Sequence, residues 1–111
     1  MIFVDYLGPA TRFANARDVV GREVATALRV PPAQVVVRRI VTEDTVDYIE
    51  VWVELSSDEQ LYRVGRRIAE RVAKELEDGS GTNVWVMYRV IPRNYAFLNG
   101  EPRGRGTPGF E

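Results

Sequence analysis

The sequence contains no cysteine and no histidine among its 111 residues, and its only lysine is Lys74. Without cysteine the chain has no disulfide framework and no thiol nucleophile. Without histidine it lacks the commonest general base and the commonest zinc ligand, and we expect neither a metal nor a cofactor. Acid–base chemistry must therefore use carboxylates, tyrosines, Lys74 or the α-amino group.

Long apolar runs and an excess of positive charge are missing as well. No apolar run approaches the roughly 20 residues of a membrane span, and Met1 to Tyr6 lacks the regions of a signal peptide. The formal net charge of -1 argues against general binding to nucleic acid, which needs a basic surface. We therefore expect a cytoplasmic, single-domain protein with neither a membrane nor a nucleic acid as partner.

Apolar periodicity predicts four strands and two amphipathic helices. A capping box at Ser56 or Ser57 marks the start of the second helix, and Gly79 to Gly81 is expected to end it. In chain order the predicted elements are strand Ile2–Tyr6, helix Asn15–Leu28, strand Val35–Thr42, strand Val46–Leu55, the second helix with its apolar stripe Leu61, Val64, Ile68, Val72 and Leu76, and a strand from Asn83 that Pro92 ends.

The last predicted strand is apolar on both faces. Val84, Val86 and Tyr88 fall on one face, and Trp85 and Met87 on the other. Because such a strand is covered on both sides, it should be central in its sheet or buried by another subunit. The segment 92–111 must then find another surface, and we expect it to be an interface arm.

The chain contains an internal repeat, VGREVATAL at 20–28 and VGRRIAERV at 64–72. The same offset aligns the first strand with the third, and it aligns the second with the fourth after a short insertion in the second loop. The single domain 1–111 should therefore contain two similar β-α-β units, 1–44 and 45–91, in an α+β fold. Parallel crossovers place both helices on one face of a four-stranded mixed sheet. The other face carries aromatic and apolar side chains that favour oligomerisation, namely Tyr48, Trp52, Trp85 and Met87.

Several segments resemble members of the tautomerase superfamily. VWVMY at 84–88, a proline, and then NYAFLNG at 94–100 resemble the C-terminus of proteins like cis-3-chloroacrylic acid dehalogenase and macrophage migration inhibitory factor. VRRIVTE at 37–43 is similar to the VRxIITE run of 4-oxalocrotonate tautomerase, and the wider stretch 29–44 to the second-strand region of these proteins. The order and spacing of these pieces carry the resemblance over nearly the whole chain. It implies a tautomerase fold, a homotrimer with tails and strand edges paired between subunits, and isomerase activity on small 2-oxo acids.

The first residue decides how far the implied activity can be transferred. The resembled enzymes use an amino-terminal proline as acid or base, whereas this sequence begins Met1-Ile2-Phe3. One hypothesis is that the primary amine of Met1, with an ordinary pKa of about 8, does a weaker version of that work. The alternative is a non-catalytic or differently catalytic trimer that keeps an anion-binding pocket, in which Met1 is an ordinary strand residue.

Arginines are the predicted substrate-binding groups. Arg38 matches the arginine of the VRxIITE run, which in the resembled enzymes binds a substrate carboxylate, so a small anionic carboxylate is the implied ligand. The alternative is an ion pair opposite Glu50 or Glu54. Three further candidates come from the last strand and the arm, with salt bridges or apolar interfaces as their alternatives: Arg89, Arg93 and Tyr95.

Departures from the resembled enzymes narrow the range of reactions that the resemblance implies. The paired arginines of the dehalogenases align with Ser57 and Gln60, and their tail glutamate with Leu98, so dehalogenation is not expected. The tail RGRGTPGF at 103–110 is expected to be an interface arm or a disordered end rather than an RNA-binding segment. A ferredoxin-like nucleic-acid module shares the element order and would need aromatic side chains on an open sheet face.

Overall fold

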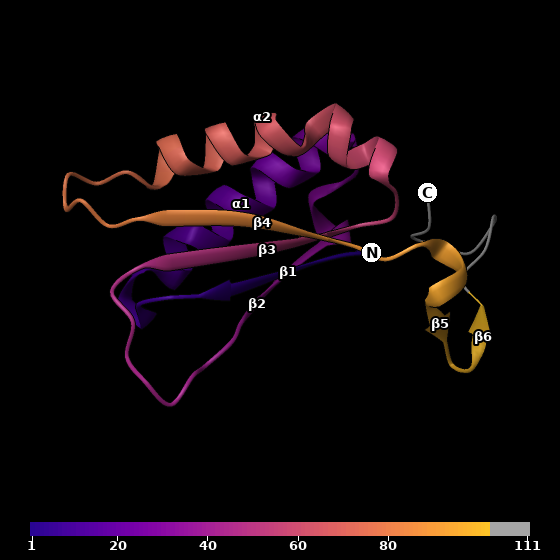
Figure 1. The fold of residues 1–111 in the computed structure, drawn as a ribbon, viewed down its shortest axis with the longest axis horizontal. Coiled ribbons are helices and arrows are strands. Elements are labelled where there is room, and N and C mark those ends of the chain that lie inside the picture. The colour runs from indigo at the N-terminus through magenta and orange to yellow at the C-terminus, as the bar shows by residue number, and fades with distance from the viewer. Residues whose placement is uncertain (103–111) are drawn as a thin grey trace.

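The computed structural model describes residues 1–102 and has a mixed four-stranded sheet of order β2-β1-β3-β4. The strands are β1 (Ile2–Leu7), β2 (Val35–Arg39), β3 (Ile49–Leu55) and β4 (Val84–Val90). β1 pairs with β2 and β3 with β4 in parallel, whereas β1 and β3 are antiparallel. The helices α1 (Phe13–Leu28) and α2 (Asp58–Leu76) lie side by side over one face of the sheet (Figure 1). The predicted α+β arrangement is confirmed.

The core lies between the helices and one face of the sheet. In β3 the alternate residues Ile49, Val51, Val53 and Leu55 are buried, as the strict alternation of the sequence predicts. Burying an aliphatic side chain of this size contributes about 1.5–3 kcal/mol. The helices supply the opposite wall of the core, from α1 with Ala16, Val19, Val20, Val24 and Ala27, and from α2 with Val64, Ile68, Val72 and Leu76.

The start of α2 is the predicted capping box, and Ser57 is the cap. Its side-chain oxygen accepts a hydrogen bond from the Gln60 amide at 3.2 Å, and the Gln60 side-chain oxygen accepts one from the Ser56 amide at 2.8 Å. At the other end, α2 stops at Leu76, before the glycines that were expected to end it. Gly79 and Gly81 instead adopt left-handed conformations in the loop that leads to β4.

β4 removes one of the two alternatives that the sequence left open, a central strand or a strand buried by another subunit. It is an edge strand that pairs with β3, not a central strand, and Trp85 on its outer face is 58% exposed. Its inner face packs under α2, where the Tyr88 hydroxyl donates to the Gly65 carbonyl oxygen at 2.5 Å and burial raises the pKa of Tyr88 to about 12. An apolar pattern on both faces indicates that a strand is covered, but it does not show which surface covers it. Cover by another subunit stays a prediction.

The loops and the C-terminal segment differ from the predicted bounds. β2 ends at Arg39 and β3 begins at Ile49, so both strands are shorter than the sequence suggests. After Pro92 the chain forms the short helix η3 (Arg93–Tyr95) and a small hairpin of β5 (Phe97–Leu98) and β6 (Glu101–Pro102). Figure 1 shows this hairpin projecting beyond the end of the main sheet. The remainder of the predicted arm, including RGRGTPGF, lies outside the described residues.

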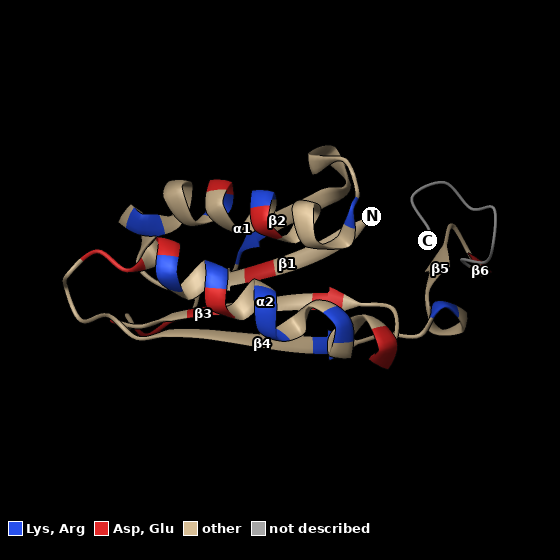
Figure 2. Ribbon diagram, turned by 90° about the horizontal axis from the view of Figure 1, so that it is seen from above, with Lys and Arg blue, Asp and Glu red and all other residues tan. Residues whose placement is uncertain are grey.

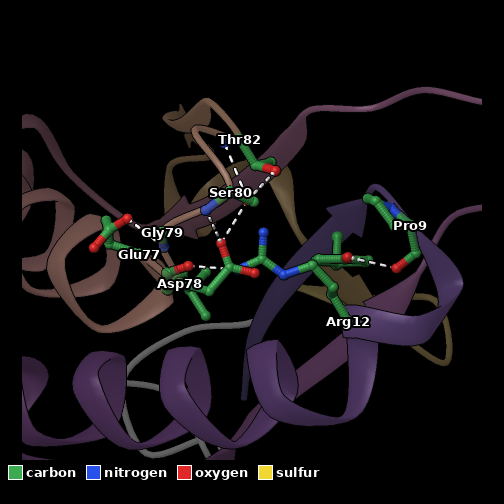
Figure 3. A network of polar contacts seen from close by, with 9 residues as sticks. Pro9, Arg12, Glu77, Asp78, Gly79, Ser80 and Thr82 are labelled. Atoms are coloured by element: carbon green, nitrogen blue, oxygen red, sulfur yellow. Dashed lines mark hydrogen bonds and ion pairs between the residues drawn. The ribbon is translucent and has the colours of Figure 1, made fainter.

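Arg12 ties the beginning of α1 to the end of α2. It follows β1 in the short helix η1 (Ala10–Arg12), and its guanidinium donates to the carbonyl oxygen of Leu76 and lies 3.6 Å from the Asp78 carboxylate (Figure 3). Hydrogen bonds from Ser80 lower the pKa of Asp78, and Arg12 lowers it further. These contacts satisfy a helix carbonyl that has no intrahelical partner. They fix the end of the molecule opposite the start of β1.

A charge network joins the outer surfaces of the two helices. Glu23 of α1 is 8% exposed, and its carboxylate accepts a hydrogen bond from Arg71 of α2 at 3.1 Å. Arg22 pairs with Glu75, which also lies 3.7 Å from Arg71. Figure 2 shows basic and acidic bands along both α1 and α2. A side-chain hydrogen bond shared with Glu75 and one donated by Arg71 lower the pKa of Glu23, and they outweigh the opposing effect of burial.

This network predicts a specific pH dependence of stability. The folded-state pKa of Glu23 is below its ordinary value of 4.5. Glu23 therefore stabilises the fold above pH 4.5, and it loses this contribution as the pH falls through the folded-state pKa. We expect Glu23→Gln to lower the free energy of unfolding at neutral pH and to flatten its dependence on pH in the acid range. Urea unfolding at a series of pH values measures both. Glu59→Gln, at an exposed helix position, is the control, and parallel curves for wild type and Glu23→Gln would contradict the expectation.

Candidate functional site

A pocket of about 400 Å³ opens at the end of the sheet where β1 begins and where β3 and β4 end. This volume is within the range of small-molecule sites. Figure 1 shows the N-terminus at the same end of the molecule from which the chain leaves β4 for the hairpin. Most of the lining is apolar and consists of Met1, Ile2, Phe3, Leu28, Val30, Pro31, Leu55, Ile91 and Ala96.

The end of α1 shapes one wall of this pocket. Arg29 adopts a left-handed conformation with φ of 57°, and the Val30 amide donates to the Ala25 carbonyl oxygen at 3.0 Å. This pairing closes the helix and reverses the chain direction. As a result Leu28 and Val30 both face the pocket, and the proline turn that starts at Pro31 continues the wall.

The other polar groups of the lining are Gln34, Glu54, Ser56 and Gln60, which the sequence did not identify as site residues. Glu54 reaches the pocket because β1 and β3 are antiparallel, with Val4 opposite Val53, so that the end of β3 lies beside the start of β1. The Gln60 side-chain oxygen also accepts a hydrogen bond from the Ser56 hydroxyl at 2.9 Å. The predicted topology contained the signal for Glu54, since it is the last polar residue of a strand that runs toward the N-terminus.

Arg38 and Arg89 lie on the open face of the sheet and meet at Asp5. Arg38 nitrogens lie 2.8 and 2.9 Å from one carboxylate oxygen of Asp5, and Arg89 donates to the other at 3.1 Å. Arg38 therefore has an ion-pair partner in β1 rather than Glu50 or Glu54. The parallel register explains this contact, because it sets Asp5 directly opposite Arg38. Neither arginine lines the pocket that residues 1–102 form at Met1.

Aromatic rings extend this cluster across the open face. The Arg38 guanidinium lies 4.8 Å from the centre of the Phe3 ring, and the Arg89 guanidinium 4.5 Å from that of Trp52. The side chain of Asp5 is only 12% exposed, whereas those of Arg38 and Arg89 are 45% and 43% exposed. The three groups together carry one net positive charge. Both guanidiniums can therefore contact a further group at this face.

Arg93 and Tyr95 both belong to η3, beyond the end of β4. Tyr95 is 71% exposed. In the sequence both residues lie between Ile91 and Ala96, which line the pocket, but neither lines the pocket itself. Of the predicted site residues, the structure therefore places Met1 in the pocket and brings Arg38 and Arg89 together elsewhere.

Residues 1–102 contain no group of three or more acidic side chains arranged to hold a metal ion. The same part of the chain has no helix with the length and hydrophobicity that crossing a membrane requires.

Comparison with known proteins gives matches in structure but not in sequence. No family sequence profile and no curated protein matches the chain. A macrophage migration inhibitory factor-like protein from Entamoeba histolytica is 9% identical and has a TM-score of 0.69, covering 91% of this chain and 97% of that one. A fused 4-OT described as an asymmetric trimer is 16% identical with a TM-score of 0.65, covering 91% and 95%. N1, a member of the cis-3-chloroacrylic acid dehalogenase family, is 17% identical with a TM-score of 0.60, covering 92% and 83%.

These matches cover 91–92% of this chain, and they include all three kinds of protein that the sequence segments resemble. The chain has the tautomerase fold, as the resemblance predicts. At these identities the likeness establishes the fold alone. The activity must be argued from the pocket at Met1.

Proposed function

We propose that the protein is a small-molecule isomerase of the tautomerase type, which moves a proton between carbon and oxygen of a keto–enol compound in the pocket at Met1. The observation that carries the proposal is the place of the chain's first residue in the wall of a largely apolar cavity of about 400 Å³. An α-amine with an ordinary pKa of about 8 populates both protonation states near neutral pH, which suits an acid–base group.

The proposed reaction needs no oxidant or reductant. In ketonisation, the ammonium form of Met1 delivers a proton to the enol carbon, the hydroxyl proton leaves to solvent, and the enol double bond becomes the carbonyl bond of the product. Solvent then returns a proton to the amine. The apolar walls exclude competing water from the reacting carbon.

Ultraviolet-monitored ketonisation of phenylenolpyruvate between about pH 6 and pH 9 tests the proposal. We expect acceleration over buffer that follows an amine-like pKa near 8, because the protonated amine is the proton donor. Intact mass of the protein must first show that Met1 is retained. Rates equal to buffer over the whole range, with this compound and with 2-hydroxymuconate, would reject isomerase activity on these substrates.

A second candidate function is a trimer that binds an anion without catalysis. The observation that favours it is the net positive charge of the Arg38–Asp5–Arg89 cluster on the open face. We propose that this face, with Trp85 exposed at its edge, packs against other copies of the chain, and that Arg93 and Tyr95 join an anion site between subunits. Carboxylate binding that is lost in Arg38→Ala, without any acceleration of ketonisation, would favour this candidate.

A further inference from the structure

We propose that the pocket at Met1 selects uncharged carbonyl compounds over carboxylates, and that Glu54 is the residue that sets this selectivity. The inference rests on the proposed function, because it names the substrate class for the same pocket. It differs from the anionic ligand that the sequence resemblance implies.

The ionisable groups of the pocket lining favour an uncharged ligand. Among the residues that line the pocket within 1–102 there is no arginine or lysine, and the charged side chain is that of Glu54. Among these described lining residues the only cation is the Met1 amine, which the proposed reaction uses for proton transfer. A carboxylate that enters the pocket loses hydration and meets a like charge, whereas an uncharged carbonyl compound avoids both costs.

Within the described part of the chain, no side chain neutralises the charge of Glu54. Arg89 lies directly opposite Glu54 in the register of β3 and β4. Its guanidinium nevertheless contacts Asp5 and the Trp52 ring instead. Residues 1–102 give the Glu54 carboxylate no ion pair and no hydrogen bond, although Glu50 on the same strand face accepts one from Trp52 at 2.9 Å. The negative charge of Glu54 therefore acts on the pocket.

Gln60 supplies a neutral group that suits the same class of ligand. Its side-chain oxygen already accepts hydrogen bonds from the Ser56 amide and hydroxyl, so only its N–H donors remain for a ligand. A neutral donor matches a ketone or ester oxygen without charge compensation. The apolar walls match an aryl or alkyl substituent.

The test compares phenylenolpyruvate with its methyl ester at neutral pH, each relative to its own rate in buffer. We expect wild type to favour the ester by about tenfold in kcat/KM, because a like charge beside the bound acid costs at least that much. Glu54→Gln should raise kcat/KM for the acid by about tenfold and leave that for the ester nearly unchanged. Glu50→Gln is the matched control, with the same substitution on the same strand face outside the pocket, and should keep the wild-type preference.

Two results would overturn the inference: an acid that wild type converts as well as the ester, or a preference that Glu54→Gln does not change. If neither compound is converted, the proposed function has failed, and selectivity is then measured by ligand-observed NMR titration with phenylpyruvate and methyl phenylpyruvate. Tighter binding of the ester to wild type, with the difference removed in Glu54→Gln, supports the inference. Equal binding, or no binding of either, rejects it.

Discussion

A proline placed at the position of Met1 is expected to raise kcat/KM for enol ketonisation by roughly tenfold or more, the scale of an improved acid–base group. The variant encodes an extra proline between Met1 and Ile2, so that removal of the initiator methionine leaves proline as the first residue. A secondary amine would then line the pocket at the place that the primary amine of Met1 now occupies. Ultraviolet assays of ketonisation, with phenylenolpyruvate and with 2-hydroxymuconate, measure the change in kcat/KM.

An alanine at the same position is the matched control for this variant. The initiator methionine is removed in the same way, and the Met1 side chain is lost in both variants. The alanine variant, however, keeps a primary amine. We expect the alanine variant to resemble wild type within a few-fold. Equal rates for the proline and alanine variants would show that the class of amine does not limit the reaction, and would contradict the expected gain from a secondary amine.

Removal of the Asp5 carboxylate is expected to have the largest effect on stability. Asp5→Ala leaves Arg38 and Arg89 facing each other without their shared counter-charge. Because both guanidiniums remain partly solvated, the expected loss is about 1–3 kcal/mol, less than for a fully buried pair. Urea unfolding at fixed protein concentration measures the loss. Because the cluster lies on the face proposed to join subunits, sedimentation analysis should also show weaker association.

Two further variants separate the causes of this loss. Asp5→Asn keeps the shape of the side chain and removes its charge, so it isolates the electrostatic part. Asp18→Ala removes an exposed aspartate that lies 3.6 Å from Arg17, and should change the free energy of unfolding by no more than about 0.5 kcal/mol. An Asp5→Ala protein as stable as Asp18→Ala would contradict the importance of the cluster.

The sequence predicts most of the fold because its periodic patterns are strong. β3 alternates without interruption, the apolar stripe of α2 recurs at helical spacing, and Ser57 with Gln60 forms the predicted cap. The position of β4 could not be predicted in this way. An edge strand covered by another surface and a central strand show the same apolar pattern.

The site was harder to predict because its contacts depend on register. Arg38 finds Asp5 only because β1 and β2 are parallel with those two residues paired, and no local feature of either strand reveals this. Glu54 resembles any polar residue on the open face of a sheet until the end of β3 is placed beside Met1. Resemblance identified the first residue as chemically important, whereas the structure alone identified the groups around it.

The measurement that tests the central claim most directly is ketonisation by protein whose α-amine has been acetylated. Lys74 is the only lysine of the chain, so Lys74→Arg leaves the α-amine as the single amine that acetic anhydride can modify, and intact mass verifies one acetyl group. The account predicts that the Lys74→Arg protein accelerates ketonisation before acetylation and falls to the buffer rate afterwards. Full activity after complete acetylation would contradict proton transfer by Met1.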